Sequence, residues 1–212
     1  MDNNLKQNIL KRLNSTAEAL RKNNMDAYVV DSKEELLEKI SGLIGKDETV
    51  FSGGSATLKE TGVIDMLVNY GYDYYYRGRC DDDGNQIDVL RKAFYGDWFL
   101  TSSNAITLDG ELYNVDGNAN RVAALSFGPK NVIVIAGYNK VVKNIDEAIE
   151  RVKGIAAPAN CIRLEKNTGC RVNGHCTNCH SSDRICCTYT VHSFQRTSGR
   201  IKVFLLPEEL GY

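Results

Sequence analysis

The feature that most constrains the fold is the run Asn-Val-Ile-Val-Ile-Ala at positions 131–136. Consecutive apolar, mostly β-branched residues are what a parallel strand covered on both faces requires. Further strands are expected at 26–30, 49–51, 73–77 and 97–101, and helices at 2–23, after Ser32, and at 57–69, 86–95 and 141–152. Strands that alternate with helices predict a three-layer α/β/α fold with a mainly parallel sheet.

The last part of the chain follows a different pattern. Two extended segments, 188–195 and 201–206, flank Thr197-Ser198-Gly199, which predicts a hairpin turn or an edge pairing. We therefore expect an α/β domain over residues 1–166. Residues 167–212 are expected to form a cysteine-rich C-terminal extension, with its strands packed on that domain.

Size and charge exclude several classes of protein. The chain has 212 residues, enough for one domain with a sizeable core. Its net charge of −1 argues against a general nucleic-acid or anionic-membrane binder. No apolar run approaches the ~20 residues of a membrane helix, and the first residues lack the apolar core of a secretory signal. These features predict a cytoplasmic protein.

A glycine-rich loop follows the expected strand at 49–51. Gly53 and Gly54 would let backbone N–H groups approach an anion, and Ser55 and Thr57 add hydroxyl groups. Glu60 is a candidate for acid–base or acyl chemistry. The alternative is a tight turn before a capped helix, with Glu60 as a favourable charge in its first turn.

Polar residues also follow the later strands, where ligands bind in open α/β sheets. Arg121 is suited to pair with a carboxylate or a phosphate. Some of the Asp-Gly and Gly-Asn pairs, such as Asp109-Gly110, are equally explained as turns. The candidate ligand-binding residues of this region are Ser103, Asn104, Asp116, Asn120, Arg121, Asn139 and Lys140.

Five of the seven cysteines and all three histidines lie between Cys170 and His192. Four thiolates can close a zinc site or hold an iron–sulfur cluster, and two intervening residues let a cysteine pair face one metal. The candidate ligands are Cys170, Cys176, Cys179 and Cys186. The spacing matches neither a zinc ribbon nor a bacterial ferredoxin, so the metal is open. Redox-active thiols and buried unliganded thiols are the alternatives.

Several motifs occur together in a characteristic order. They are Gly53-Gly54-Ser55, Ser103-Asn104-Ala105-Ile106-Thr107, Asp116-Gly117-x-x-Asn120-Arg121-Val122-Ala123, Gly128-Pro129-Lys130, Gly137-x-Asn139-Lys140, Pro158-Ala159-Asn160 and Leu210-Gly211-Tyr212. In this combination the chain resembles the lactate-utilisation (LUD) domain family over nearly its whole length. The resemblance implies a fold of the sugar-phosphate isomerase and CoA-transferase type. It also implies a place in the bacterial oxidation of L-lactate to pyruvate, alongside iron–sulfur partner proteins.

Three functions follow as hypotheses. The first is a subunit or accessory enzyme of lactate oxidation that binds a small organic acid or a phosphorylated metabolite. The second is a metal- or redox-responsive binding module built on the cysteine-rich tail. The third, by fold analogy alone, is an acyl- or CoA-transferase with Glu60 as nucleophile. A homo-oligomer is compatible with each of them.

Overall fold

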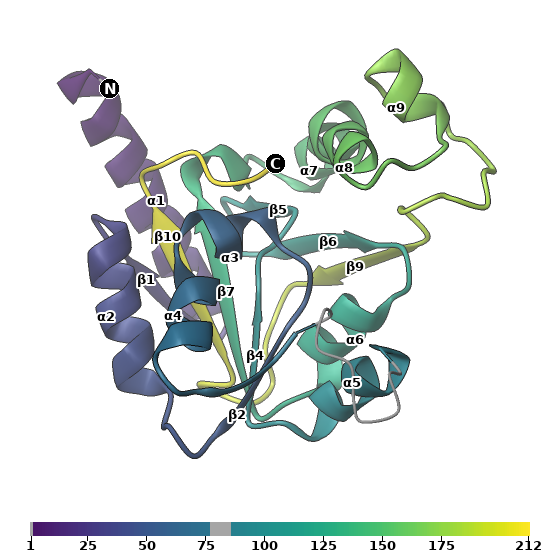
Figure 1. Ribbon diagram of the computed structural model, residues 1–212. Coiled ribbons are helices and arrows are strands. Elements are labelled where there is room, and N and C mark those ends of the chain that lie inside the picture. The colour runs from purple at the N-terminus through teal and green to yellow at the C-terminus, as the bar shows by residue number, and fades with distance from the viewer. Residues whose placement is uncertain (1, 77–85) are drawn as a thin grey trace.

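A computed structural model describes residues 2–76 and 86–212 (Figure 1). A six-stranded sheet forms its centre, and every pairing between neighbouring strands is parallel. In spatial order the strands are β1 (Asp26–Val29), β10 (Ile201–Leu206), β7 (Asn131–Gly137), β4 (Trp98–Thr101), β2 (Thr49–Ser52) and β3 (Asp73–Tyr75). The parallel sheet that the run at 131–136 predicts is confirmed.

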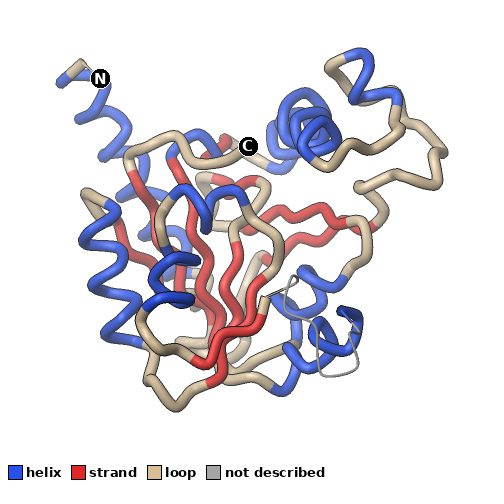
Figure 2. The backbone as a smooth tube through the Cα atoms, viewed as in Figure 1, coloured by secondary structure: helices blue, strands red, loops and turns tan. Residues whose placement is uncertain are grey.

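Helices cover both faces of this sheet, which completes the three predicted layers (Figure 2). One face packs against α1 (Asn3–Lys22), α6 (Asn120–Phe127) and the 3-10 turn η1 (Ala93–Tyr95), which follows α5 (Gln86–Lys92). The other packs against α2 (Lys33–Leu43), α3 (Ala56–Glu60) and α4 (Val63–Asn69). Successive side chains of β7 alternate between the two cores, because Val132 and Val134 join the first and Ile133 and Ile135 the second.

A second sheet of four short strands lies beside the first. Its order is β8 (Val141–Val142), β5 (Ala105–Thr107), β6 (Leu112–Asp116) and β9 (Thr188–His192). One face of it joins the core under α1, and the other packs against α7 (Ile145–Arg151) and the π-helical turn η3 (Val152–Ala156). α8 (Ala157–Arg163) and α9 (Gly169–Asn173) continue from η3. Within the described residues, no helix is both long and apolar enough to cross a membrane.

Three sequence predictions need correction. The segments near 188–195 and 201–206 form no hairpin, because β9 pairs with β6 while β10 lies inside the six-stranded sheet. The helix predicted over 57–69 is divided at Gly62, whose backbone is left-handed with φ 76°. The helix predicted over 141–152 begins only at Ile145, because residues 141 and 142 pair with β5. Residue 77, the expected end of the strand at 73–77, lies outside the described residues.

Gly110 in the β5–β6 turn supports a first prediction. Its φ is +80°, and a Cβ there would lie 2.5 Å from the backbone carbonyl carbon of Ala19 at the end of α1. Gly110→Ala combines a left-handed backbone cost with overpacking, so we expect a loss of about 3 kcal/mol in the free energy of unfolding. Urea denaturation measures it.

Gly42→Ala is the matched control for Gly110→Ala. Gly42 lies in α2, and apart from its own helix backbone and chain neighbours no atom of the described residues lies within 4 Å of the place that a Cβ would take. Alanine should therefore stabilise the chain by up to about 1 kcal/mol. Equal stability of the two variants would contradict the close approach at Gly110.

Candidate functional site

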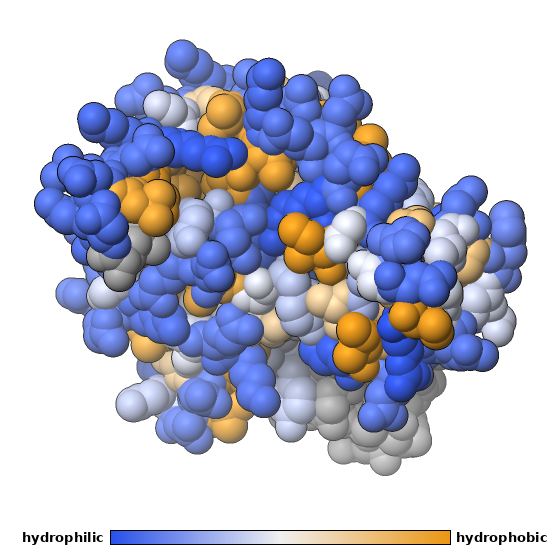
Figure 3. Space-filling view, turned by 90° about the horizontal axis from the view of Figure 1, so that it is seen from above, coloured by the Kyte–Doolittle hydropathy of each residue, from blue (hydrophilic) through white to orange (hydrophobic). Residues whose placement is uncertain are grey.

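A cavity of about 480 Å³ lies at the carboxyl ends of four adjacent strands. Its walls include the segments that follow β2, β4, β7 and β10, so residues far apart in sequence meet there. The chain reverses its direction of travel across the sheet between β2 and β4, and such a reversal is where open α/β sheets bind ligands. Figure 3 views the molecule from this side, where the surface is mostly hydrophilic with scattered hydrophobic side chains.

The structure brings most of the predicted ligand-binding residues together around this cavity. Those that line it are Gly54, Ser55, Thr57, Ser103, Asn104, Asp116, Asn120, Arg121 and Lys140. Gly53 and Asn139 lie behind the wall, and a Cβ at Gly53 would be 3.3 Å from the Arg121 side chain. Glu60 and the four predicted metal-ligating cysteines are also outside the lining.

Arg121 organises the wall from within. Its Nη1 donates to the Asn114 Oδ1 at 2.6 Å, and its Nη2 donates to the Asn104 Oδ1 at 2.9 Å. The remaining Nη donors go to the backbone carbonyls of Ser102 and Val115, and its Nε lies 3.7 Å from Asp116. The guanidinium is therefore occupied by the protein, so Arg121 contributes positive charge and rigidity rather than a free fork for a ligand.

Lys140, in the 3-10 turn η2 (Tyr138–Lys140), is a buried amine in the floor of the cavity. Its Nζ donates to Thr57 Oγ1 at 2.8 Å and to Ser102 Oγ at 2.9 Å. Burial, together with the positive charges of Arg151 and Arg121, lowers the pKa of Lys140 to about 7, against an opposing effect of Glu60. A substantial fraction of this amine is therefore uncharged at neutral pH.

The segment after β10 closes one side of the cavity. The side-chain amide of Asn139 binds this segment through two hydrogen bonds: its Oδ1 accepts from Leu210 N, and its Nδ2 donates to Gly211 O. Glu60 Oε2 accepts from Gly211 N at 2.7 Å. These contacts place Tyr212 in the cavity lining, with its hydroxyl buried and without a hydrogen-bond partner in the described chain. In this structure Glu60 and Asn139 support the wall.

The charged side chains that line the cavity are mostly cationic. Besides the partly uncharged Lys140, the cationic side chains are those of Arg121, Arg163, Lys166 and Arg184, and the carboxylates are those of Asp116 and Asp183. Asp183 is already paired with Lys166 at 3.6 Å, and Asp116 accepts from the first backbone amides of α6. The excess of positive charge suits an anionic ligand.

Several lining residues escaped prediction from the sequence. Three of them could have been predicted from the sequence. Ser102 adjoins a predicted serine, and Asn160 and Tyr212 lie in motifs on which the family resemblance rests. No sequence pattern indicated Arg163, Lys166 or the segment 182–185. They lie at the end of a helix and in loops whose positions depend on tertiary packing. The buried Arg151 behind the floor was also missed. It donates to the carbonyls of Asn139 and Asn104.

The four predicted metal ligands do not assemble. Cys170 is buried with its thiol 3.6 Å from that of Cys161, while Cys186 packs on the core of the second sheet. No group of three or more Cys, His, Asp or Glu side chains able to hold a metal occurs in residues 2–76 and 86–212. A bound zinc or iron–sulfur cluster stays a prediction from sequence. Cys161 and Cys170 are buried free thiols, which is the state that the packed-thiol alternative describes. Burial raises the pKa of Cys161 to about 11. Cys80 lies outside the described residues.

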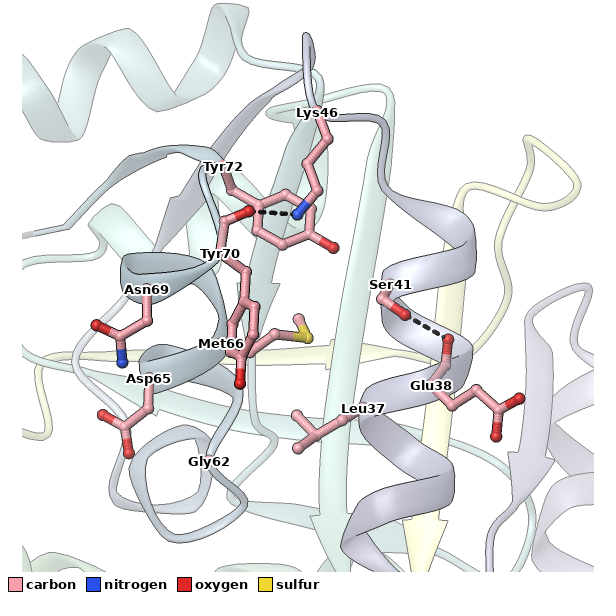
Figure 4. A pocket seen from close by; sticks show the side chains of 10 residues that line it. All are labelled: Leu37, Glu38, Ser41, Lys46, Gly62, Asp65, Met66, Asn69, Tyr70 and Tyr72. Carbon is pink, nitrogen blue, oxygen red and sulfur yellow. Dashed lines mark hydrogen bonds between the residues drawn. The ribbon is translucent and has the colours of Figure 1, made fainter.

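A larger cavity, of about 630 Å³, lies between α2 and α4 (Figure 4). Leu37 and Met66 form its apolar wall, while Lys46 Nζ lies 3.3 Å from the centre of the Tyr72 ring. Ser41 Oγ donates to the Glu38 carbonyl of its own helix. Lys46 and Ser41 are thus engaged with their neighbours. The charged lining is one lysine with two carboxylates, Glu38 and Asp65, so this cavity lacks the positive charge of the first.

Fold and site together define an α/β/α protein with an anion-suited cavity at the carboxyl edge of a parallel sheet. The sequence pattern of the LUD domain matches residues 13–206. The chain therefore belongs to the LUD domain family, which confirms the resemblance. A crystal structure of a DUF162 family protein from Deinococcus radiodurans is similar to it, with a TM-score of 0.54 and 17% sequence identity, over 93% of this chain and 98% of that one. That likeness shows the fold. No curated protein matches the chain.

Replacing Arg121 tests its structural role. Lysine offers one compact ammonium where Arg121 supplies a planar fork to four acceptors. Arg121→Lys leaves buried acceptors unpaired, so we expect it to lower the free energy of unfolding by about 3 kcal/mol. Arg163→Lys is the control, since exposed Arg163 bonds only to Asn160 among the described residues and should change stability by under about 0.5 kcal/mol. Similar effects of the two variants would refute the role of Arg121.

His192 makes the stability of the protein depend on pH. Its Nε2 lies 3.0 Å from Ser126 Oγ, and its Nδ1 is buried without a hydrogen-bond partner in the described chain. Burial, with the charges of Arg200 and Arg121, lowers the pKa of His192 below 6.5, although a backbone contact with Leu112 opposes the shift. The unfolded chain therefore binds the proton more tightly.

The free energy of unfolding should consequently fall as the pH decreases below about 6.5, where unfolded histidine takes up a proton. His192→Gln removes this part of the dependence, whereas His180→Gln, at an exposed position, keeps it. Denaturant titrations between pH 5 and 8, roughly the range in which histidines titrate, measure the slopes. Identical slopes for the wild type and His192→Gln would show that His192 is not responsible.

Proposed function

We propose that this LUD-domain protein acts in lactate utilisation by binding a small organic acid, or a phosphorylated metabolite, in the cavity at the carboxyl edge of the main sheet. The observation that carries the proposal is the charge of the cavity, where four cationic side chains, besides the partly uncharged Lys140, face two carboxylates. Family membership supports the role in lactate metabolism. Iron–sulfur proteins of lactate oxidation are proposed as partners on the resemblance alone.

The polar groups of the cavity support a small ligand over a large one. The side chains of Asn118 and Asn120 line it and make no hydrogen bond within the described part of the chain, so both are available to a ligand. Arg163 keeps its Nη1 available, because only its Nε and Nη2 bind Asn160. A volume of about 480 Å³ lies in the usual range of small-molecule sites.

The other hypotheses gain no specific support. The Glu60 carboxylate holds the backbone of Gly211 and lies outside the cavity lining, so no observation favours acyl transfer through it. A metal- or redox-responsive module would need converging thiols. The thiols of the buried Cys161 and Cys170 lie 3.6 Å apart, and the described residues contain no group of three or more side chains able to hold a metal.

Calorimetric titration tests the proposed ligand class. L-lactate, pyruvate and inorganic phosphate are the probes, and lactamide is the uncharged control with nearly the same shape as lactate. We expect at least one anion to bind, with an affinity that falls as salt is added, and lactamide to bind far more weakly. Equal affinity for lactate and lactamide, or no binding by any of the anions, would contradict the proposal.

A variant pair locates the binding site. Arg163→Gln removes a charge from the cavity wall and should weaken anion binding about threefold to tenfold, the effect of one partly exposed charged contact. Lys11→Gln removes an equal charge from the exposed side of α1 and should leave the affinity unchanged. Equal weakening by both variants would indicate a general charge effect rather than this site.

A further inference from the structure

The hydrogen bonds of Lys140 leave its amine ready to react. An uncharged amine has two N–H groups, and Thr57 Oγ1 and Ser102 Oγ accept two bonds from Nζ at 2.8 and 2.9 Å. No described residue donates a hydrogen bond to the nitrogen, so its lone pair is free to attack a ligand. The residue is 3% exposed and still contributes to the cavity lining. An amine held in this way is a nucleophile rather than a surface charge.

The charged groups around Lys140 favour this uncharged form. Arg121 of α6 lies in the cavity lining and Arg151 of α7 lies outside it, and each is fixed by hydrogen bonds to backbone carbonyls. Glu60 of α3 opposes them, but its carboxylate accepts from Gly211 N. Two fixed cations against one exposed carboxylate make a third buried positive charge costly.

We propose that Lys140 forms an imine with a small 2-oxo carboxylate bound in this cavity. The inference rests on the proposed function, because the cavity must first accept an organic anion. It adds the substrate class: the cationic wall with Arg163 and Arg184 attracts the carboxylate, and the amine of Lys140 requires a carbonyl carbon. A plain hydroxy acid or a phosphate offers no such carbon.

The reaction balances without an oxidant or a reductant. The lone pair of Nζ attacks the carbonyl carbon, which forms a C–N bond and sends the C=O electron pair to oxygen. Both protons of the uncharged amine pass to the carbonyl oxygen, which leaves as water. The product is a neutral imine, so the step adds no positive charge to the buried site.

The neighbours of Lys140 suit this step. Thr57 and Ser102 hold the amine from two sides, and their hydroxyl groups can pass protons between nitrogen and the departing oxygen. The buried, unpartnered hydroxyl of Tyr212 lines the same cavity and can donate to an oxygen of the ligand.

Reductive trapping tests the proposal. The whole protein is incubated with pyruvate and sodium cyanoborohydride, which reduces an imine to a stable amine, and the lysine peptides are mapped by mass spectrometry. We expect one reduced adduct, on the peptide with Lys140, at a rate that rises as the pH increases through about 7. The adduct should be absent in Lys140→Arg and present in Lys143→Arg, which alters an exposed lysine three residues away.

The outcomes separate this inference from the proposed function. Pyruvate that binds by calorimetry but gives no adduct at Lys140 would overturn the imine and leave the anion site standing. Adducts spread over exposed lysines, with Lys140 unmodified, would overturn it as well. Absence of an adduct, together with no binding of lactate, pyruvate or phosphate, would remove the proposed function too. If Lys140→Arg does not fold, the peptide map of the wild type still decides the question.

Discussion

The guanidinium of Arg121 is the contact on which the cavity depends. It joins the loop after β4, through Ser102 and Asn104, to the strand β6 of the second sheet, through Asn114 and Val115. Two further hydrogen bonds cross the same junction, from Ser103 Oγ to Tyr113 O and from Val115 N to the Asn104 Oδ1 that Arg121 also binds. Because the acceptors of Arg121 lie on both sides of the junction, this one side chain helps to fix the loop after β4 against β6 where the ligand-facing residues lie.

Local patterns predicted the main sheet well. The uninterrupted apolar run of β7 is readable because both faces of that strand are covered, which the alternation of its side chains between two cores now explains. The second sheet was missed because β5 and β8 have three and two residues, too few for any periodicity. The hairpin error at 188–206 has a similar cause, since nothing local shows that β9 and β10 belong to different sheets.

The sequence predicted the site residues that directly follow strands of the main sheet, but not those that lie on α8 and in later loops. Polar residues directly after β2, β4 and β7 signalled a common edge, and Thr57, Asn104 and Lys140 do meet there. No sequence rule predicts the wall formed by α8 and residues 182–185. Its position depends on long-range contacts such as that of Lys166 with Asp183. Arg184 adds to this wall while donating to the carbonyls of Cys179 and Cys186. The cysteine-rich segment is thereby part of the cavity, whatever its thiols bind.

The wide turn η3 has a consequence for how such a cavity can change between relatives. A π-helical turn holds one residue more than an α-helical turn, so each residue after it lies about 100° from the place that an uninterrupted α-helix of the same sequence would give it. α7 before the turn packs on the second sheet, whereas α8 after it presents Asn160 and Arg163 to the cavity. The extra residue therefore sets which side chains of α8 face the cavity. Loss of a single residue between 152 and 156 would let the turn close as an α-helical turn, and Asn160 and Arg163 would keep their direction. This turn is thus a place where the chain can lose a residue and keep the wall, so a different chemistry in the wall requires substitution of the two side chains themselves.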